Sequence, residues 1–566
     1  MAKKKRHHPG SPVPARVAQD YALIEQELDG IETAVEDPTR AQAQTRLDQL
    51  FRHRRQLPEV LFRRLLSGRT RHVPLMLGLL DLSAAERSEG YLRRILAAPE
   101  SPDPVRYFVR QRMGWPIEDE VSGRRAFLGT LRDAPATLVE AVHQASASWP
   151  PDGNALTEVL NFLEVLPATE REPIVTRMAA DLGAEAGWLL RALLHNDFAR
   201  TARRALDGLL AHRPPGAEAA VRRLAETASN TNVRRDARKA LQRLAGEPAQ
   251  LPAAKALPPL DDLVASVYDL SGAQTMWVVR TESADLCMFA NFLCQDGSGL
   301  VSVLGLRFSS LDVVDAMQDY SESNGPPLIG IELAAARAII AEALEENARS
   351  GEPVPPEFEF WEPVLHDSYP PPAADTSVVT SLDDTPYAGR HDLIERSGEL
   401  AEHFCFIGWA YDSEDVWRHI RGLPPPLLEP WTAQDYAKLT DRLVNDAEAA
   451  RLRRLLGRQA WLLEQEGEEE ARDVALAVAA ALAASRRGER ARIPFILAII
   501  ERSIAGLFSG LLPDDDQDDD LDVFLTALPI LTPPPLDQPP PLTAPKLRLV
   551  GGPAVPRPRK RNLSRG

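Results

Sequence analysis

Two histidines and two glutamates recur at every fourth position in one segment of the chain, at His391, Glu395, Glu399 and His403. On a continuous helix this spacing places all four side chains along one face, and imidazole and carboxylate groups are ligands for zinc or iron. The ends of such a row lie about 18 Å apart, so at most one His–Glu pair could reach a single ion. Ser397 and Gly398 also interrupt the helical pattern. We therefore expect an exposed helix face rather than a metal site.

Four carboxylates in the middle of the chain are candidates for a cleft, namely Asp285, Asp296, Asp312 and Glu332. Their positions suit turns and helix starts equally well, so they receive no catalytic role. The sequence contains no phosphate-binding loop, dinucleotide fingerprint, nucleophile elbow or Cys-x-x-Cys pair. The acidic run from Asp514 resembles a calcium loop, but Asp519 stands where Gly is required and Leu525 where a bidentate Glu is required. No catalytic, cofactor-binding or metal residues are assigned, and no cofactor is expected.

The three cysteines of this 566-residue chain do not suggest a disulfide framework, which indicates a reducing compartment. Cys287 and Cys294 are seven residues apart on an expected strand, so they face opposite sides of a sheet and should not share a metal. Cys405 lies in an apolar run, where burial would raise its thiol pKa and make it inert.

An arginine-rich region near the start of the chain is a candidate nucleic-acid site, because arginines neutralise phosphates. It comprises Arg52, Arg54, Arg55, Arg63, Arg64, Arg69 and Arg71. Only Phe51 and Phe62 interleave with these arginines, so base stacking has little support. The solvated face of a helix is the favoured interpretation.

The clearest evidence for regular secondary structure in this chain is a sequence repeat. Residues 197–209 read Asp-Phe-Ala-Arg-Thr-Ala-Arg-Arg-Ala-Leu-Asp-Gly-Leu, and residues 232–244 read Asn-Val-Arg-Arg-Asp-Ala-Arg-Lys-Ala-Leu-Gln-Arg-Leu, 35 positions later. In both copies the apolar positions step by four, three, one and three residues, which places one apolar stripe on a helix. Asp197 and Asn232 stand at N-cap positions. A turn, Arg213–Gly216, and a further amphipathic helix lie between the copies.

A helix–turn–helix unit of this length is typical of solenoid repeats, and its arginine- and alanine-rich second helix resembles the HEAT or armadillo-type helical repeats. The resemblance covers residues 197–245. It implies a stacked helical array that binds other macromolecules. The alternative is an irregular helical domain in which two helices are alike. Helical runs extend the domain back to residue 18, with breakers at Pro58, Gly68, Pro74, Pro167 and Gly183.

The sequence pattern changes from helical to strand-like after a proline-containing linker over residues 246–261. Short apolar runs separated by turn residues predict a three-stranded meander, at Gln274–Arg280, Leu286–Cys294 and Leu300–Phe308. The middle run lacks polar alternation, as expected for a strand covered on both faces. Ser309 and Asp312 have capping-box spacing and predict a helix, and a second helix is expected from about Ile331 to Arg349.

The predicted fold class is mainly α. We expect a HEAT-like α-solenoid over residues 18–245, a small α+β module with a short antiparallel sheet over 262–365, and a C-terminal helical bundle over 391–512. Residues 366–390 form a Pro-rich linker. Residues 1–17 and 513–566 are expected to be disordered tails, the first basic and the second acidic and then Pro-rich and basic.

Charge is distributed unevenly. Residues 1–250 contain 37 Lys and Arg against 32 Asp and Glu, whereas the remainder contains 28 against 50. The halves could pair with each other or bind two kinds of partner. No secretory signal is visible, and Glu501 and Arg502 interrupt the longest apolar stretch near the C-terminus, at a high cost in a membrane. A cytoplasmic location with no membrane partner is expected.

These patterns predict a non-enzymatic protein-interaction or scaffold protein that uses a helical-repeat surface to bind another protein. One alternative is a nucleic-acid-associated protein that binds through its basic N-terminal half. The other alternative is an enzyme with an unrecognised site in the α+β module.

Overall fold

A computed structural model describes residues 15–36, 50, 56–84, 87–114, 120–147, 149–195, 199–245, 254–283, 286–308, 326–370, 378–420, 423 and 431–509. The described chain is mainly helical with a small antiparallel sheet region. It divides into two compact units between Leu190 and Arg191. The expected helix beginning at Ser309 and the C-terminal tail lie outside the described residues.

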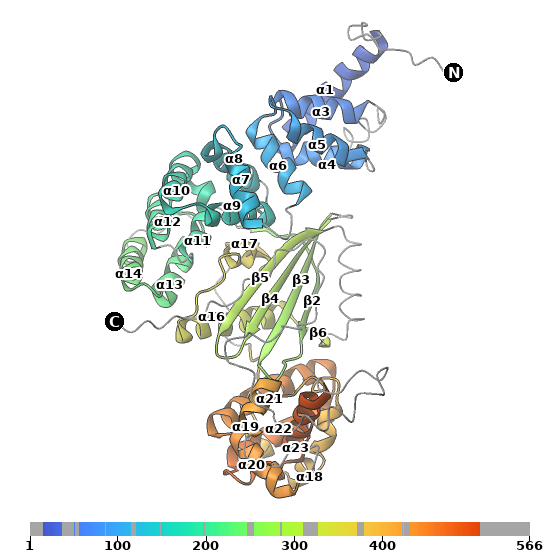
Figure 1. The fold of residues 1–566 in the computed structure, drawn as a ribbon, viewed down its shortest axis with the longest axis vertical. Coiled ribbons are helices and arrows are strands. Elements are labelled where there is room, and N and C mark those ends of the chain that lie inside the picture. Colours follow the sequence, from blue (N-terminus) through green and yellow to red (C-terminus); the bar gives the residue numbers. More distant parts are fainter. Residues whose placement is uncertain are drawn as a thin grey trace, which may run out of the picture. The chain divides into compact units, whose positions relative to one another are not determined.

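The described part of the first unit is helical (Figure 1). Gly68 ends its second described helix in the left-handed conformation, with φ of +65°, as a glycine breaker should. Pro58 and Pro74 lie in the first turns of their helices, where a missing N–H costs nothing. The helices are α1 (Ala15–Glu36), α3 (Leu57–Ser67), α4 (Val73–Ala84), α5 (Ser88–Ala97), α6 (Asp103–Met113), α7 (Glu120–Leu128), α8 (Ala134–Ala147), α9 (Gly153–Val165), α10 (Ala168–Leu182), η3 (Gly183–Ala186) and the start of α11 (Gly187–Leu194).

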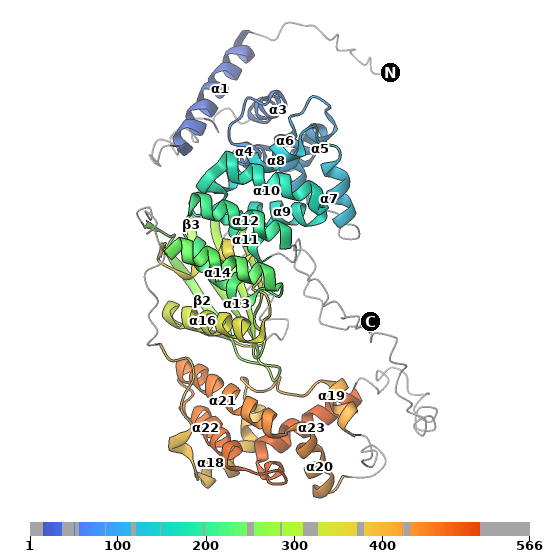
Figure 2. The same cartoon turned by 90° about the vertical axis from the view of Figure 1, so that its left-hand side faces the viewer.

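The second unit begins with the end of α11 and three amphipathic helices, α12 (Ala199–His212), α13 (Ala217–Thr227) and α14 (Thr231–Ala245). Helix α14 packs against both α12 and α13, and the three lie side by side in Figure 2. The turn predicted between the repeat copies connects α12 to α13, where Gly216 has a φ of +77°. A fully antiparallel sheet follows (Figure 1).

The sheet has five strands in the order β5-β4-β3-β2-β6 and is therefore wider than the expected meander. The three predicted runs are its longest strands, and two further strands extend the sheet beyond the first run on the same side, the inner one pairing with that run and the outer one with the inner one. The strands are β2 (Leu260–Ser266), β3 (Ala273–Ser283), β4 (Leu286–Gln295), β5 (Gly299–Phe308) and β6 (Leu328–Gly330). A separate two-stranded ladder joins β1 (Lys255–Ala256) to β7 (Ser368–Tyr369).

One sheet face is covered by α16 (Leu333–Ser350), α17 (Phe358–Trp361) and η4 (Glu362–Leu365). The ring of Phe292 on β4 meets that of Phe358 at a centroid distance of 6.5 Å. Trp361 lies directly over Gly305 on β5, so the absence of a Cβ there makes room for the indole. The opposite face carries a second apolar cluster formed by Trp277, Val279, Cys287 and Phe289. Strand β4 is thus buried on both faces, as its sequence predicts.

The C-terminal helices pack around α21 (Asp446–Glu466) and α22 (Glu469–Ala484), which run side by side (Figure 2). The Asn445 side chain caps α21, and Gly467 ends it in the left-handed conformation. The buried amide of Gln459 on α21 accepts a hydrogen bond from the backbone N–H of Tyr268, beyond β2. The remaining elements are η5 (Thr385–Tyr387), α18 (His391–Glu395), η6 (Ser397–Glu402), α19 (Ser413–Ile420), α20 (Ala433–Leu443), η7 (Arg490–Arg492) and α23 (Pro494–Ser509).

No helix within the described ranges combines the length and the apolar character that a membrane span requires.

Candidate interaction surface

A fully buried carboxylate joins the repeat helices to the segment that follows the sheet. Glu359 on α17 has no exposed area, yet three cationic or imidazole side chains surround it. Its Oε1 accepts from Nε2 of His195 at 2.9 Å and from Nη2 of Arg223 on α13 at 2.7 Å, and its Oε2 lies 3.5 Å from Nε of Arg191 on α11. Burial alone would raise the pKa of Glu359, but the charge of Arg223, the hydrogen bond from His195 and the charge of Arg191 hold it well below its usual range.

Two further groups complete this buried ionic cluster. The Arg191 guanidinium also donates to the backbone oxygen of Glu359 at 2.9 Å and to the hydroxyl of Tyr369 on β7. Burial raises the pKa of Tyr369 to about 12, so this phenol stays neutral. A Cβ at Gly216 would overlap both the Arg191 guanidinium and the Tyr369 hydroxyl. The cluster therefore fixes α11, α13 and the α12–α13 turn to the module.

A nearby histidine makes the same region sensitive to acid. Burial, reinforced by the positive charges of Arg337 and Arg280, lowers the pKa of His366 from 6.5 to about 4. Between these values the unfolded chain binds more protons than the folded chain, so stability falls as the pH drops through this window. Protonation of Glu359, whose folded pKa is also depressed, adds a further loss below its ordinary pKa of 4.5.

We expect His366→Gln to lose less stability than the wild type between about pH 7 and about pH 4, because it removes the titrating imidazole. Urea unfolding followed by circular dichroism at several pH values measures this slope. The exposed His391→Gln is the matched control and should keep the wild-type slope. If the free energy of unfolding depended on pH equally in His366→Gln and the wild type, His366 would not be the source of this acid sensitivity.

The repeat detected in the sequence corresponds to equivalent buried stripes on two helices that pack together. On α12 the stripe contains Ala202, Ala205, Leu206 and Leu209, all buried. On α14 it contains Val233, Ala237, Ala240 and Leu244. Alanine at the shared positions allows the close approach of α12 and α14. Asp197 and Phe198 lie outside the described residues.

The outward sides of the same two helices carry the basic residues of the repeat. Positions 200 and 235, 203 and 238, and 204 and 239 are all Arg or Lys in both copies. The Arg203 guanidinium lies 3.1 Å from the carboxylate of Asp236, which connects the two helices across this surface. We call these six side chains the basic stripe, namely Arg200, Arg203, Arg204, Arg235, Arg238 and Lys239.

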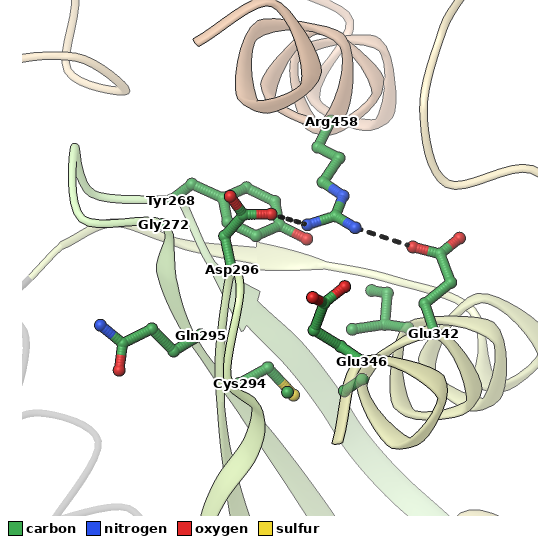
Figure 3. A pocket seen from close by; sticks show the side chains of 11 residues that line it. Tyr268, Gly272, Cys294, Gln295, Asp296, Glu342, Glu346 and Arg458 are labelled. Carbon is green, nitrogen blue, oxygen red and sulfur yellow. Dashed lines mark hydrogen bonds and ion pairs between the residues drawn. The ribbon is translucent and has the colours of Figure 1, made fainter. Parts of the chain in front are cut away.

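A small cavity lies where the ends of the sheet strands meet α16 and α21 (Figure 3). Arg458 of α21 reaches toward the carboxylates of Asp296 and Glu342, at 3.5 and 3.3 Å. The cavity of about 30 Å³ also borders Tyr268 and Cys294, and burial raises the pKa of the Cys294 thiol to about 12. Its volume suits a water molecule or two, far below the roughly 300 Å³ or more of usual ligand pockets. The ion pairs thus clamp α21 to the module.

The carboxylates that the sequence singled out do not meet as a group. Asp296 lies at this cavity, whereas Glu332 is the N-cap residue of α16 and does not line it. Asp285 and Asp312 lie outside the described residues, as does the acidic run from Asp514. The convergent carboxylates Glu342 and Glu346 of α16 were not anticipated from the sequence.

The four-residue His/Glu row does not occupy one helix. Helix α18 ends at Glu395, a 3₁₀ segment follows from Ser397, and His403 lies beyond it. The carboxylate of Glu468, rather than Glu399, lies 3.9 Å from His403 Nε2. Within the described ranges, no three His, Cys, Asp or Glu side chains are grouped to hold a metal ion.

Cys405 is buried, and burial raises the pKa of its thiol to about 12, as its apolar surroundings predict. Cys287 belongs to the apolar cluster on one sheet face, and Cys294 borders the cavity at the α16 face. The two cysteines of β4 therefore lie on opposite faces, as their spacing requires.

Part of the N-terminal basic region is engaged inside the first unit. The Arg64 side chain is only 3% exposed and contacts the carboxylates of Glu25, Asp29 and Glu32. Arg63 pairs with Glu59 on its own helix. Arg52, Arg54 and Arg55 lie outside the described residues.

Sequence reasoning missed the buried ionic cluster, although two of its members leave a local signal. Arg191 is the lone charge in Trp188-Leu-Leu-Arg-Ala-Leu-Leu194, and Glu359 is the lone charge in Phe358-Glu-Phe-Trp361. A single charge inside an apolar run indicates a buried, paired group.

No known family model, curated protein or solved structure matches this chain.

Proposed function

We propose that this chain is a non-enzymatic protein-interaction or scaffold protein, with helical repeats of the HEAT or armadillo type as its binding surface and α12 and α14 as the clearest part of that surface. The observation that carries the proposal is the pairing of two equivalent helices that bury the same stripe and expose the same outward side. Stacked repeats of this kind present extended surfaces to macromolecular partners.

Rigid anchoring of this surface also supports the proposal. The buried ionic cluster fixes α11 and α13 to the module, and α14 packs on α13. A surface held in one conformation pays less ordering entropy on binding a partner than a mobile one.

Site-specific photo-crosslinking in the cells that make the protein tests this proposal. Asp207 and Gln242 occupy equivalent exposed positions of α12 and α14, and each is replaced by a photoreactive phenylalanine. We expect both to yield a covalent adduct with the same partner protein, because both face the same ligand.

Arg487, exposed between α22 and α23, is the matched control position. It should give no such adduct. If the two repeat positions gave no adduct, or gave the same adducts as Arg487, the proposal would be wrong.

A further inference from the structure

The equivalence of the two repeat copies extends to side chains that packing does not require. Buried stripes must match, because each helix contacts its neighbours in the same way. The basic stripe is on the opposite side, where the side chains of Arg203, Arg204 and Arg235 are 43%, 52% and 63% exposed. Three basic positions nevertheless coincide at the same offset in α12 and α14. A repeated positive charge on a solvent-facing surface is complementary to a ligand with repeated negative charge.

The stripe is continuous across the two helices. Asp236 lies between Arg203 of α12 and Arg235 of α14, at 3.1 and 3.8 Å. Arg204 is 3.9 Å from Asp207 on its own helix. Asp207 and Asp236 balance only part of the charge of the stripe, which consists of six Arg and Lys side chains. The surplus is positive in a chain whose net charge is −17.

We propose that the basic stripe binds an acidic segment of a partner protein, rich in Asp and Glu. This inference rests on the proposed interaction function and names its partner class. Arginines four residues apart on a helix are separated by about 6 Å, and alternate side chains of an extended peptide by about 7 Å. Carboxylates on every second residue of such a peptide therefore match the spacing of the stripe, and guanidinium groups bind carboxylates with bidentate geometry.

Carboxylates are favoured over nucleic acid phosphates by two observations. Residues 199–245 contain no Phe, Tyr or Trp, so the surface offers no platform on which bases stack. The strongly acidic remainder of the chain repels a long polyanion that extends past the stripe, whereas a short acidic segment fits within it.

The test measures binding of a fluorescein-labelled oligoglutamate peptide to the full-length protein by fluorescence anisotropy at low salt. An oligoglutamine peptide and a DNA duplex are the comparison ligands. The test variant is Arg235→Glu, Arg238→Glu and Lys239→Glu together. The matched control reverses three exposed arginines between α22 and α23, at Arg486, Arg487 and Arg492, and has the same net charge.

We expect oligoglutamate to bind the wild type and the control, to bind the test variant at least about tenfold more weakly, and to dissociate as salt is raised. Oligoglutamine should not bind. Circular dichroism and thermal unfolding establish that both variants are folded.

Absence of oligoglutamate binding to the wild type, or an equal loss in test and control variants, would overturn the proposal. Tighter binding of the DNA duplex, lost in the test variant alone, would overturn it in favour of nucleic acid. If Gln242 still formed its protein adduct in cells while oligoglutamate failed to bind, the interaction function would stand and only the acidic partner class would fail.

Discussion

The substitution Glu359→Gln is expected to lower the free energy of unfolding of the second unit by about 3–5 kcal/mol, the usual cost of removing one partner of a buried ion pair. The amide preserves the shape of the side chain but removes its charge. Arg191 and Arg223 would then be buried facing each other without their common counter-ion, with Glu362 at 3.8 and 3.7 Å as the remaining carboxylate.

Hydrogen exchange and urea unfolding measure this effect. Amides of α13 should exchange much faster in Glu359→Gln, since the cluster that anchors the helix is weakened. Glu352→Gln makes the same chemical change at an exposed residue and should leave both measurements unchanged. Wild-type stability of Glu359→Gln would show that the cluster contributes nothing.

The second large effect is expected at Gly305. A Cβ at this position would overlap the indole of Trp361, whose side chain is 1% exposed and has no free space to enter. We expect Gly305→Ala to cost about 1–3 kcal/mol, the range for overpacked cores, although alanine normally suits a strand better than glycine.

Gly330→Ala on β6 is the matched control, because no heavy atom lies within 4 Å of the added methyl group. It should be neutral or slightly stabilising. In a double-mutant cycle, Trp361→Leu should remove most of the penalty of Gly305→Ala, since the smaller side chain makes room for the methyl group. Additive effects of the two substitutions would argue against the contact.

Much of the local structure could be predicted because it depends on neighbours in the sequence. The apolar stripe at Ala237 and Ala240 follows from helical periodicity, and the β4 run from its unbroken apolar character. Strand β6 escaped prediction because it has three residues and follows a pair of prolines. Strand β2 was not predicted because Asp261 and Asp262 are consecutive polar residues, which interrupts the alternation of apolar and polar residues expected of a strand.

The charged clusters were beyond the reach of such patterns. Glu359 meets Arg223 across 136 positions and His195 across 164, and Arg458 meets Asp296 across 162. Periodicity describes which side of an element is apolar, but it contains no information on which distant element supplies a counter-charge. The expectation that His391 to His403 share one helix face was wrong for a local reason, because the helix ends at Glu395.

The buried ionic cluster also limits how this chain can be rearranged by recombination. A cut between residues 246 and 261, where the composition suggests a domain border, would separate Arg191 and Arg223 from Glu359. One product would keep the buried cations of this cluster and the other its buried carboxylate, so neither would fold as it does now. Helices α11 to α14 and the sheet module therefore depend on each other for folding, and an experimental dissection of the chain should keep residues 191–370 in one piece.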